Sequence, residues 1–303
     1  MADTEPQTSW PSFAARQAVE IPLFAIGWQV LYFAVAWSNN VLSEALSPLP
    51  IVIAAWIRLA VLYFAVGVVL VYARYALFEV LFRSTPYITP RPVPNRIDLF
   101  TWDRVTVSLG IITAGAALLV NREIVPVRWL TVGDHLQLLA LWLATDLVYF
   151  LAHLAMHGRR LYGPIHAHHH RAVRRPNALA DPDRFSPIEG LWNFAVSVLV
   201  FELARQAVPL SPDLLILAAI QWWMVGQFQH GGKDIPVNQV PGLEIARRLA
   251  GVRHSMCLQH DAHHIRMSRH FSMTGIFDRW LLPERRRESP YRSVSRSGVQ
   301  GVG

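Results

Sequence analysis

Two copies of the motif H-x-x-H-H, far apart in the chain, constrain the fold more than any other feature of the sequence. A shorter motif, H-x-x-x-H, precedes the first copy. The eight histidines are His153 and His157, then His166, His169 and His170, and finally His260, His263 and His264. Residues three and four apart share one face of a helix, so each motif predicts a helix with imidazoles on one side. Imidazole binds Fe, Zn, Cu and Ni. Eight imidazoles exceed what one ion uses, so the simplest interpretation is two metal ions where these helices meet.

A histidine-rich sequence can also arise without metal ligation, but these clusters do not fit such an origin. A run of histidines can be a purification tag or a low-complexity tract, and a single helical histidine is usually solvated or hydrogen-bonded. The clusters here are internal, differ in their remaining residues and repeat one spacing. The repeated spacing favours metal ligation.

The composition is typical of an integral membrane protein. Of the 303 residues 52% are hydrophobic and only 16% are charged, against about a quarter charged in soluble proteins. Apolar runs predict helices near residues 21–37, 53–75, 105–120, 136–151, 189–208 and 212–228. Several are at the short end of the length needed to span a bilayer. We therefore expect an all-α membrane bundle of about four to six membrane helices with a cytoplasmic histidine-rich helical cap.

The chain is expected to form one domain over residues 1–303, with a polar N-terminal segment (1–20) and a basic, disordered tail (284–303). Arginine placement predicts its orientation. The loop 38–50 has no arginine or lysine, whereas 83–104 and 158–184 are arginine-rich. By the positive-inside rule, the histidine clusters and both termini are cytoplasmic. The net charge of +7 is then explained by membrane orientation and by contact with lipid head groups rather than by nucleic-acid binding.

Two residues around the first cluster are expected to support it. Asp146 lies two helical turns before His153, and a carboxylate in an apolar run is a candidate functional group. We expect it to accept the second ring N–H of a ligating histidine, although a structural bond to a neighbouring helix is an alternative. Pro164 is expected to open a new helix that carries the first H-x-x-H-H motif.

The remaining histidines differ in their expected roles. His230 follows the last apolar run and is expected to be a ninth ligand, the alternative being a capping or interfacial histidine. His168 lies on another helical face and is expected to be solvated or to support a ligand. Ligation by His254 or His270 is left open, and His135 is expected on the opposite side of the membrane. Cys257, the single cysteine, excludes an intrachain disulfide and a cysteine-ligated iron–sulfur centre; we expect it to be a small packing residue.

The order of the histidine motifs resembles the fatty acid hydroxylase/sterol desaturase superfamily over roughly residues 146–282. RFSPIE, which contains Glu189, is similar to that family's R-x-H-P-x-E, with Ser186 in place of histidine. FDRWL (277–281) is similar to W-D-R-L-F. The family's usual Tyr-Gly after the last histidine trio is replaced by Arg269-His270-Phe271, which leaves the substrate open.

The resemblance implies an O₂-dependent di-iron oxidoreductase of the hydroxylase or desaturase type. Its cofactor would be two Fe ions, its ligands the eight motif histidines and His230, and its candidate catalytic residues Asp146 and Glu189. It would act on a lipid, sterol or other apolar molecule, with electrons from a separate ferredoxin, cytochrome or reductase. A membrane zinc hydrolase with Glu189 as base, or a metal transporter, is the alternative. The position oxidised, the electron donor and the oligomeric state are not predicted.

Overall fold

The computed structural model describes residues 9–50, 127–173, 187–207, 240–265 and 269–282, with single positions among residues 53–57 and 214–229. All regular elements within this part are helical, which confirms the all-α prediction. They are α1 (Trp10–Ala45), α5 (Val132–Met156), the π-helix η2 (Tyr162–His166), α6 (Ala167–Val173), α7 (Pro187–Ala207), α9 (Leu243–Leu249), α10 (Met256–Ile265) and α11 (Ile276–Leu281). The apolar runs at 53–75 and 105–120, the histidine His230 and the tail 284–303 lie outside the described residues or almost wholly so.

Helix α5 carries the first histidine motif and is longer than the run predicted at 136–151. Thr131 and Asp134 form a capping box at its start, in which each side chain accepts the other residue's backbone N–H. Its 25 residues extend over about 38 Å, more than the apolar core of a bilayer. Among the described helices, α5 alone passes a test of length and apolar composition for crossing a membrane. The number of membrane helices stays a prediction.

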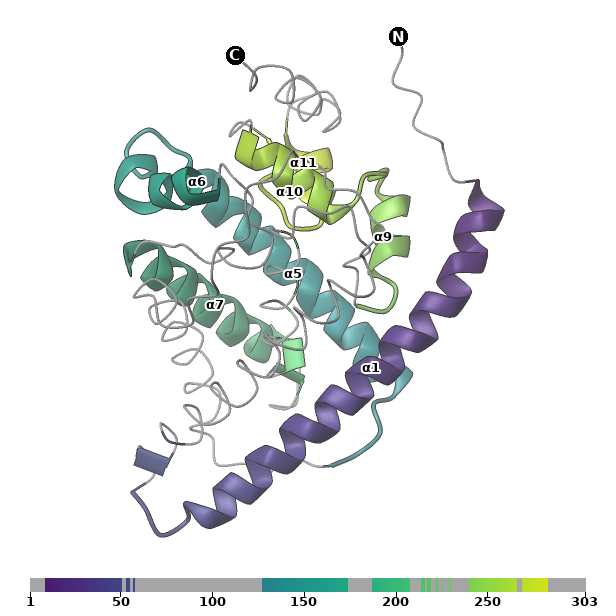
Figure 1. Cartoon of the computed structure of the whole chain (residues 1–303), viewed down its shortest axis with the longest axis vertical. Coiled ribbons are helices and arrows are strands. Elements are labelled where there is room, and N and C mark those ends of the chain that lie inside the picture. Colours follow the sequence, from purple (N-terminus) through teal and green to yellow (C-terminus); the bar gives the residue numbers. More distant parts are fainter. Residues whose placement is uncertain are drawn as a thin grey trace, which may run out of the picture.

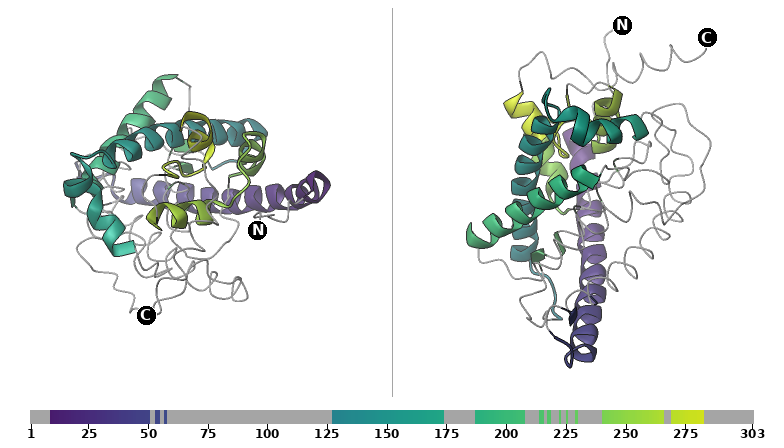
Figure 2. Two further views of the ribbon diagram at one scale, coloured as in Figure 1. Left: turned by 90° about the horizontal axis from the view of Figure 1, so that it is seen from above. Right: turned by 90° about the vertical axis from the view of Figure 1, so that its left-hand side faces the viewer.

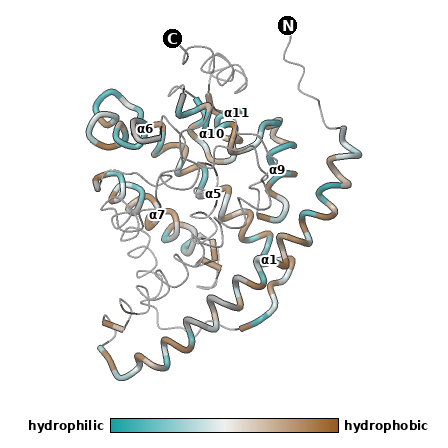
Figure 3. Tube along the Cα trace, viewed as in Figure 1, coloured by the Kyte–Doolittle hydropathy of each residue, from teal (hydrophilic) through white to brown (hydrophobic). Residues whose placement is uncertain are grey.

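Helix α1 runs diagonally past α5 along one side of the molecule (Figure 1). It begins at Trp10, inside the segment predicted to be polar, and its 36 residues cover the apolar run 21–37. The buried Trp28 and Tyr32 belong to one cluster with Leu138 and Leu141 of α5. The opposite face exposes Val19, Leu23, Ile26, Val30 and Trp37. The hydropathy view shows hydrophobic residues, interspersed with hydrophilic ones, along α1 (Figure 3). Such an exposed apolar face suits a lipid environment.

The short helices α6, α10 and α11 lie at the end of α5 that bears the histidines, whereas α9 lies beside the part of α5 that contains Leu139 and Trp142 (Figures 1 and 2). A second core cluster holds α9, α10 and the loop before α11 against α5; in it Trp142 of α5 packs with Leu243, Met256, Cys257 and Met273. Cys257 is buried in this cluster, in agreement with its predicted packing role. We call these short helices the cap; its place on the cytoplasmic side of a membrane bundle stays a prediction.

The connection between α5 and α6 differs from the prediction. The helix that carries the first H-x-x-H-H motif begins at Tyr162, two residues ahead of Pro164, and its first turn is a π-helix. Pro164 lies within that turn, where a missing N–H leaves no hydrogen bond unmade. The π-turn ends at His166 and α6 continues directly to His169 and His170. π-Turns often occur at functional sites.

Candidate metal centre

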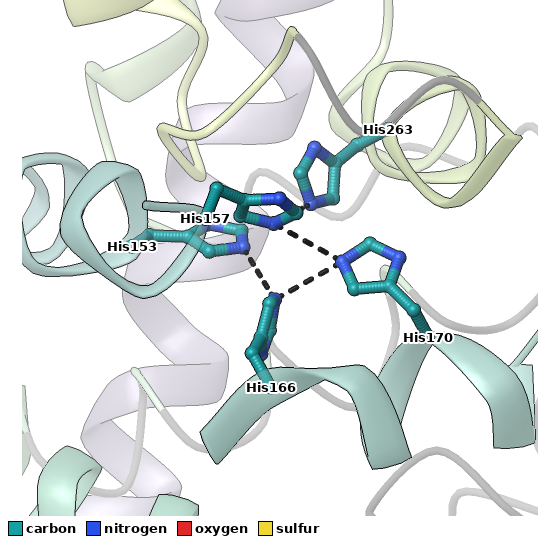
Figure 4. Close-up of side chains that lie close together, drawn as sticks. All are labelled: His153, His157, His166, His170 and His263. Atoms are coloured by element: carbon teal, nitrogen blue, oxygen red, sulfur yellow. Dashed lines mark hydrogen bonds between the residues drawn. The ribbon is translucent and has the colours of Figure 1, made fainter. Parts of the chain in front are cut away.

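All eight motif histidines converge at the end of α5, and they form two groups. In each group, one ring nitrogen from every member lies within 4.8 Å of the others. The first group contains His153, His157, His166, His170 and His263 (Figure 4), and the second contains His169, His260 and His264. The predicted helices therefore do bring their imidazoles together.

Each H-x-x-H-H motif is divided between the two groups. The first and last histidines of a motif stay together, as His166 and His170 do in the larger group and His260 and His264 in the smaller. The middle histidine of each motif belongs to the other group, His169 to the smaller and His263 to the larger. On a helix, positions i and i+4 differ by about 40° in direction, whereas i+3 and i+4 differ by about 100°. Where two such helices face each other, the middle histidine of each points to the group formed mainly by the other. Each group is therefore complete only with histidines from both motifs.

The ring nitrogens of the larger group face one another as metal ligands do. His153 donates its Nδ1 hydrogen to the carbonyl of Phe271 (2.8 Å), and His166 donates its own to Glu189 Oε1 (2.5 Å). A neutral imidazole carries one hydrogen, so both Nε2 atoms present lone pairs. These two Nε2 atoms lie 3.0 Å apart. Two lone pairs at this distance repel, and a shared cation between them turns the contact into ligation. The donor set therefore fits a metal ion.

Burial keeps these imidazoles neutral, which is the form that binds metal. Burial, with the nearby His153 and His170, lowers the pKa of His157 to about 2. The same causes hold the pKa values of His166 and His263 well below their usual range. The group is thus ready to bind an ion at neutral pH without first losing protons.

The smaller group lies directly beside the larger one. The Nε2 atoms of His260 and His264 are 2.9 Å apart, and the rings of His169 and His264 are 4.8 Å apart between centroids. The ring of His170, from the larger group, is also 4.8 Å from that of His264. All three members are buried. Two neighbouring binding positions, with five and three nitrogen ligands, are the arrangement that two ions need.

Three acceptors hold the outer nitrogens of the larger group. The carbonyl of Phe271 binds His153, and the carbonyl of Arg269 accepts from Nδ1 of His263 at 2.5 Å. The third acceptor is Glu189, in the first turn of α7 and fully buried. Such acceptors fix the tautomer and direction of a ligating ring. Glu189, expected as a catalytic residue, therefore contacts the outer nitrogen of His166, on the side of the ring away from the other histidines.

Asp146 does not have the partner expected from the sequence. Its carboxylate accepts hydrogen bonds from the hydroxyl of Ser272, the backbone N–H groups of Met273 and Thr274, and the hydroxyl of Thr274. These donors belong to the loop before α11, not to a histidine ring or a helix. The expected hydrogen bond to a ligating histidine was wrong because the loop, rather than an imidazole, packs beside Asp146 on α5.

The structure also places the other histidines. His168 is exposed, and His254 is half-buried. His270 is buried, and its burial lowers its pKa to about 3, but neither it nor His254 belongs to either group. His135 lies in the first turn of α5, at the end away from the cap. Sequence reasoning missed the two carbonyl acceptors, since any residue has a carbonyl and no residue type signals them.

It also missed the fully buried Arg247 of α9. Its guanidinium donates to the carbonyls of Thr274 and His254 and pairs with Glu244 (2.6 Å). The signal available was an arginine inside a short amphipathic segment, which is not specific.

The comparison with protein families found a match that covers the whole of the candidate site. Residues 138–282 match the family model described as fatty acid hydroxylase. The matched segment contains α5 from Leu138 onward, both histidine groups and α11. Neither the comparison with curated proteins nor that with solved structures found a match.

Proposed function

Residues 138–282 belong to the fatty acid hydroxylase family of membrane-associated oxidoreductases, and on that premise we propose that the chain is a di-iron membrane oxygenase. It would use O₂ and two external electrons to hydroxylate, or desaturate, an unactivated C–H of a lipid, sterol or similar apolar molecule. The observation that carries the proposal is the pair of adjacent histidine groups, five and three imidazoles, buried at one end of α5.

The donor set favours iron over zinc. Zinc sites in proteins are almost always four-coordinate, and the larger group offers five nitrogens. Its Nε2 atoms lie 3.0 to 3.1 Å from their neighbours. Ligands at right angles around an ion with bonds of about 2.1 Å are about 3.0 Å apart, whereas tetrahedral ligands would be about 3.4 Å apart. The spacing supports an ion with more than four ligands.

Two alternatives fit these positions less well. In a zinc hydrolase Glu189 would serve as the base, but its Oε1 accepts from Nδ1 of His166, on the far side of that ring from the other ligands. In a metal transporter the histidines would follow a path across the membrane. Both groups instead lie at one end of α5.

The chain's own residues would hold the histidine ligands in fixed directions and exclude water from the site. Two irons held by the eight histidines would supply the oxidising power, with one oxygen atom of O₂ entering the product or water and the other leaving as water. Glu189 and the carbonyls of Arg269 and Phe271 hold three rings in fixed directions. The burial of the histidines would keep bulk water away from the two ions. Leu136 and Leu151 expose an apolar face along α5, which supports entry of substrate from the bilayer.

Electrons would arrive from an acidic carrier protein at the exposed turn after α5. His157 is the one member of the larger group that is partly exposed. Arg159 and Arg160 are exposed beside it, and opposite charge steers and orients such encounters. The double variant Arg159→Glu/Arg160→Glu should raise the KM for a reduced ferredoxin at least tenfold, which corresponds to about 1.4 kcal/mol. Arg253→Glu, at an exposed arginine elsewhere on the cap, serves as the control. An equal effect of all these variants would contradict this docking position.

The membrane orientation is part of the proposal. The histidine end of α5 would face the cytoplasm, as arginine placement indicates. Arg248 of α9 lies over the rings of Trp10 and Phe13, at 4.6 and 4.3 Å from their centroids, and Arg247 of the same helix donates to the carbonyl of Thr274, in the loop that contacts the candidate metal centre. The start of α1 is therefore on the same side as the metal centre, which supports a cytoplasmic N-terminus. Labelling of a cysteine introduced at Ser9 in intact cells would test this orientation.

The test of the proposed function is a labelled-oxygen assay. Iron-loaded protein in lipid nanodiscs, given a reduced ferredoxin, a lipid extract and ¹⁸O₂, should release a lipid that carries ¹⁸O in a new hydroxyl group. Desaturation would instead produce a lipid with a new double bond and place the label in water. Zinc-loaded protein that cleaves a lipid without added electrons would overturn the proposal in favour of a hydrolase.

A further inference from the structure

The loop from Arg269 to Gly275 lies between two carboxylates and the metal centre. On one side, the carbonyls of Arg269 and Phe271 accept from the Nδ1 atoms of His263 and His153. On the other side, Asp146 and Asp278 accept from the loop. One loop therefore contacts ligands from two different helices, α10 and α5.

Every backbone N–H from Phe271 to Ile276 is used within this arrangement. Asp278 accepts from the N–H groups of Phe271 and Ser272, each at 2.8 Å. Asp146 accepts from those of Met273 (2.7 Å) and Thr274 (3.2 Å). The last two donate to side chains of the loop, Gly275 to Ser272 Oγ and Ile276 to Thr274 Oγ1. With its donors turned towards the carboxylates, the loop presents carbonyls to the histidines.

The backbone of the loop is strained at the residue between those two carbonyls. His270 has φ +57°, the one described non-glycine residue with positive φ. This conformation is uncommon outside glycine, and histidine tolerates it better than bulky or branched residues. Strain of this kind persists where its surroundings hold it in place. The hydrogen bonds that Asp146 and Asp278 accept from the loop are such a hold.

We propose that Asp146 is a positioning residue that acts through the loop 269–275 to fix the rings of His153 and His263. Because both of these rings belong to the five-histidine group, loss of Asp146 would weaken that position and spare the three-histidine position. The proposal rests on metal binding by the histidines, which is part of the proposed function, but not on oxygenase activity.

The experiment is a Co²⁺ titration of the metal-free protein, followed by visible absorption and by metal analysis after desalting. The wild type should bind about two ions per chain. Asp146→Asn keeps the shape of the side chain but turns an N–H₂ towards backbone donors, and it should lose about 10- to 100-fold in affinity at one position. The desalted variant should then hold about one ion, bound by the three-histidine group.

The control is Asp134→Asn, the same substitution at the other end of the same helix. Asp134 binds Arg128 and Thr131, far from the histidines, so this variant should lose stability but bind both ions as the wild type does. If Asp146→Asn does not fold, Thr274→Val replaces it. That variant removes a hydroxyl that donates to Asp146, and it should show a smaller loss at the same position.

The outcomes are distinct. Unchanged affinity in folded Asp146→Asn, or equal loss at both positions in that variant with helicity intact, would overturn the positioning role. A wild type that binds no metal would instead refute the proposed function.

Discussion

The Nε2 atoms of His153 and His166 face each other at 3.0 Å while each ring donates its Nδ1 hydrogen outward, to Phe271 and to Glu189. The contact is repulsive between neutral rings and becomes favourable around a cation. The hydrogen bonds to Phe271 and Glu189 fix the directions of both rings. A substitution that relieves this repulsion should therefore stabilise the metal-free protein and lower its affinity for metal.

Substitution of Glu189 should weaken the five-histidine position. Glu189→Gln keeps the size of the side chain but can place an amide N–H₂ against Nδ1 of His166, and we expect the Co²⁺ affinity of this position to fall about 10- to 100-fold. Glu202→Gln makes the same substitution further along α7 and should leave the affinity unchanged. Equal affinities of the two variants would show that the 2.5 Å contact of Glu189 with His166 does not support ligation.

Adjacent histidines in the first H-x-x-H-H motif should behave oppositely. His169 belongs to the three-histidine group, whereas His168 is exposed. His169→Ala should reduce bound metal from about two ions to about one per chain, while His168→Ala should retain both. Metal analysis of the desalted variants measures this difference. A loss of metal in His168→Ala would argue against the observed grouping.

Arginines that are neighbours on α9 should contribute unequally to stability. Arg247→Met removes a buried guanidinium that donates to Glu244 and to two carbonyls, so the free energy of unfolding should fall by about 3–5 kcal/mol. Arg248→Met removes a cation from the rings of Trp10 and Phe13 and should cost about 0.5–1 kcal/mol. Thermal unfolding in detergent compares the two variants. A larger loss in Arg248→Met would contradict this assignment.

Removal of metal should destabilise the cap. An ion bound to the folded state alone stabilises it by about 2.7 kcal/mol at a concentration one hundred times its Kd. Treatment with a chelator should lower Tm, and added Fe²⁺ or Co²⁺ should restore it in a concentration-dependent way. The double variant His157→Ala/His169→Ala, which takes one ligand from each group, should show a smaller shift with metal. A Tm independent of metal in the wild type would mean that the histidines do not bind ions in the folded protein.

Much of the site could be predicted because its information is local. The spacing of H-x-x-x-H and H-x-x-H-H predicts helices that each place imidazoles on one side. The histidines lie in α5 and at its C-cap, in the continuous turn of η2 and α6, and in α10. The division of each motif between two groups depends on how α6 faces α10, which is a tertiary relationship. No local pattern contains it.

The supporting residues were harder to predict. Asp146 was expected to bind an imidazole, but a loop more than a hundred residues later packs against it. The carbonyls of Arg269 and Phe271 have no residue-type signal at all. The all-helical class could be predicted from the apolar runs. The start of α1 at Trp10 could not, because the N-cap at Ser9 and the packing of Phe13 extend the helix through a polar segment.

The exchange of middle histidines between the motifs has a consequence for biosynthesis. A ribosome delivers His153 to His170 well before α10, and at that stage the larger group lacks His263 while the smaller has only His169. One ten-residue helix then completes both positions in a single docking event. If the two groups bind metal, both sets of ligands would be complete only after α10 has docked, and a chain released before residue 260 would leave both groups incomplete.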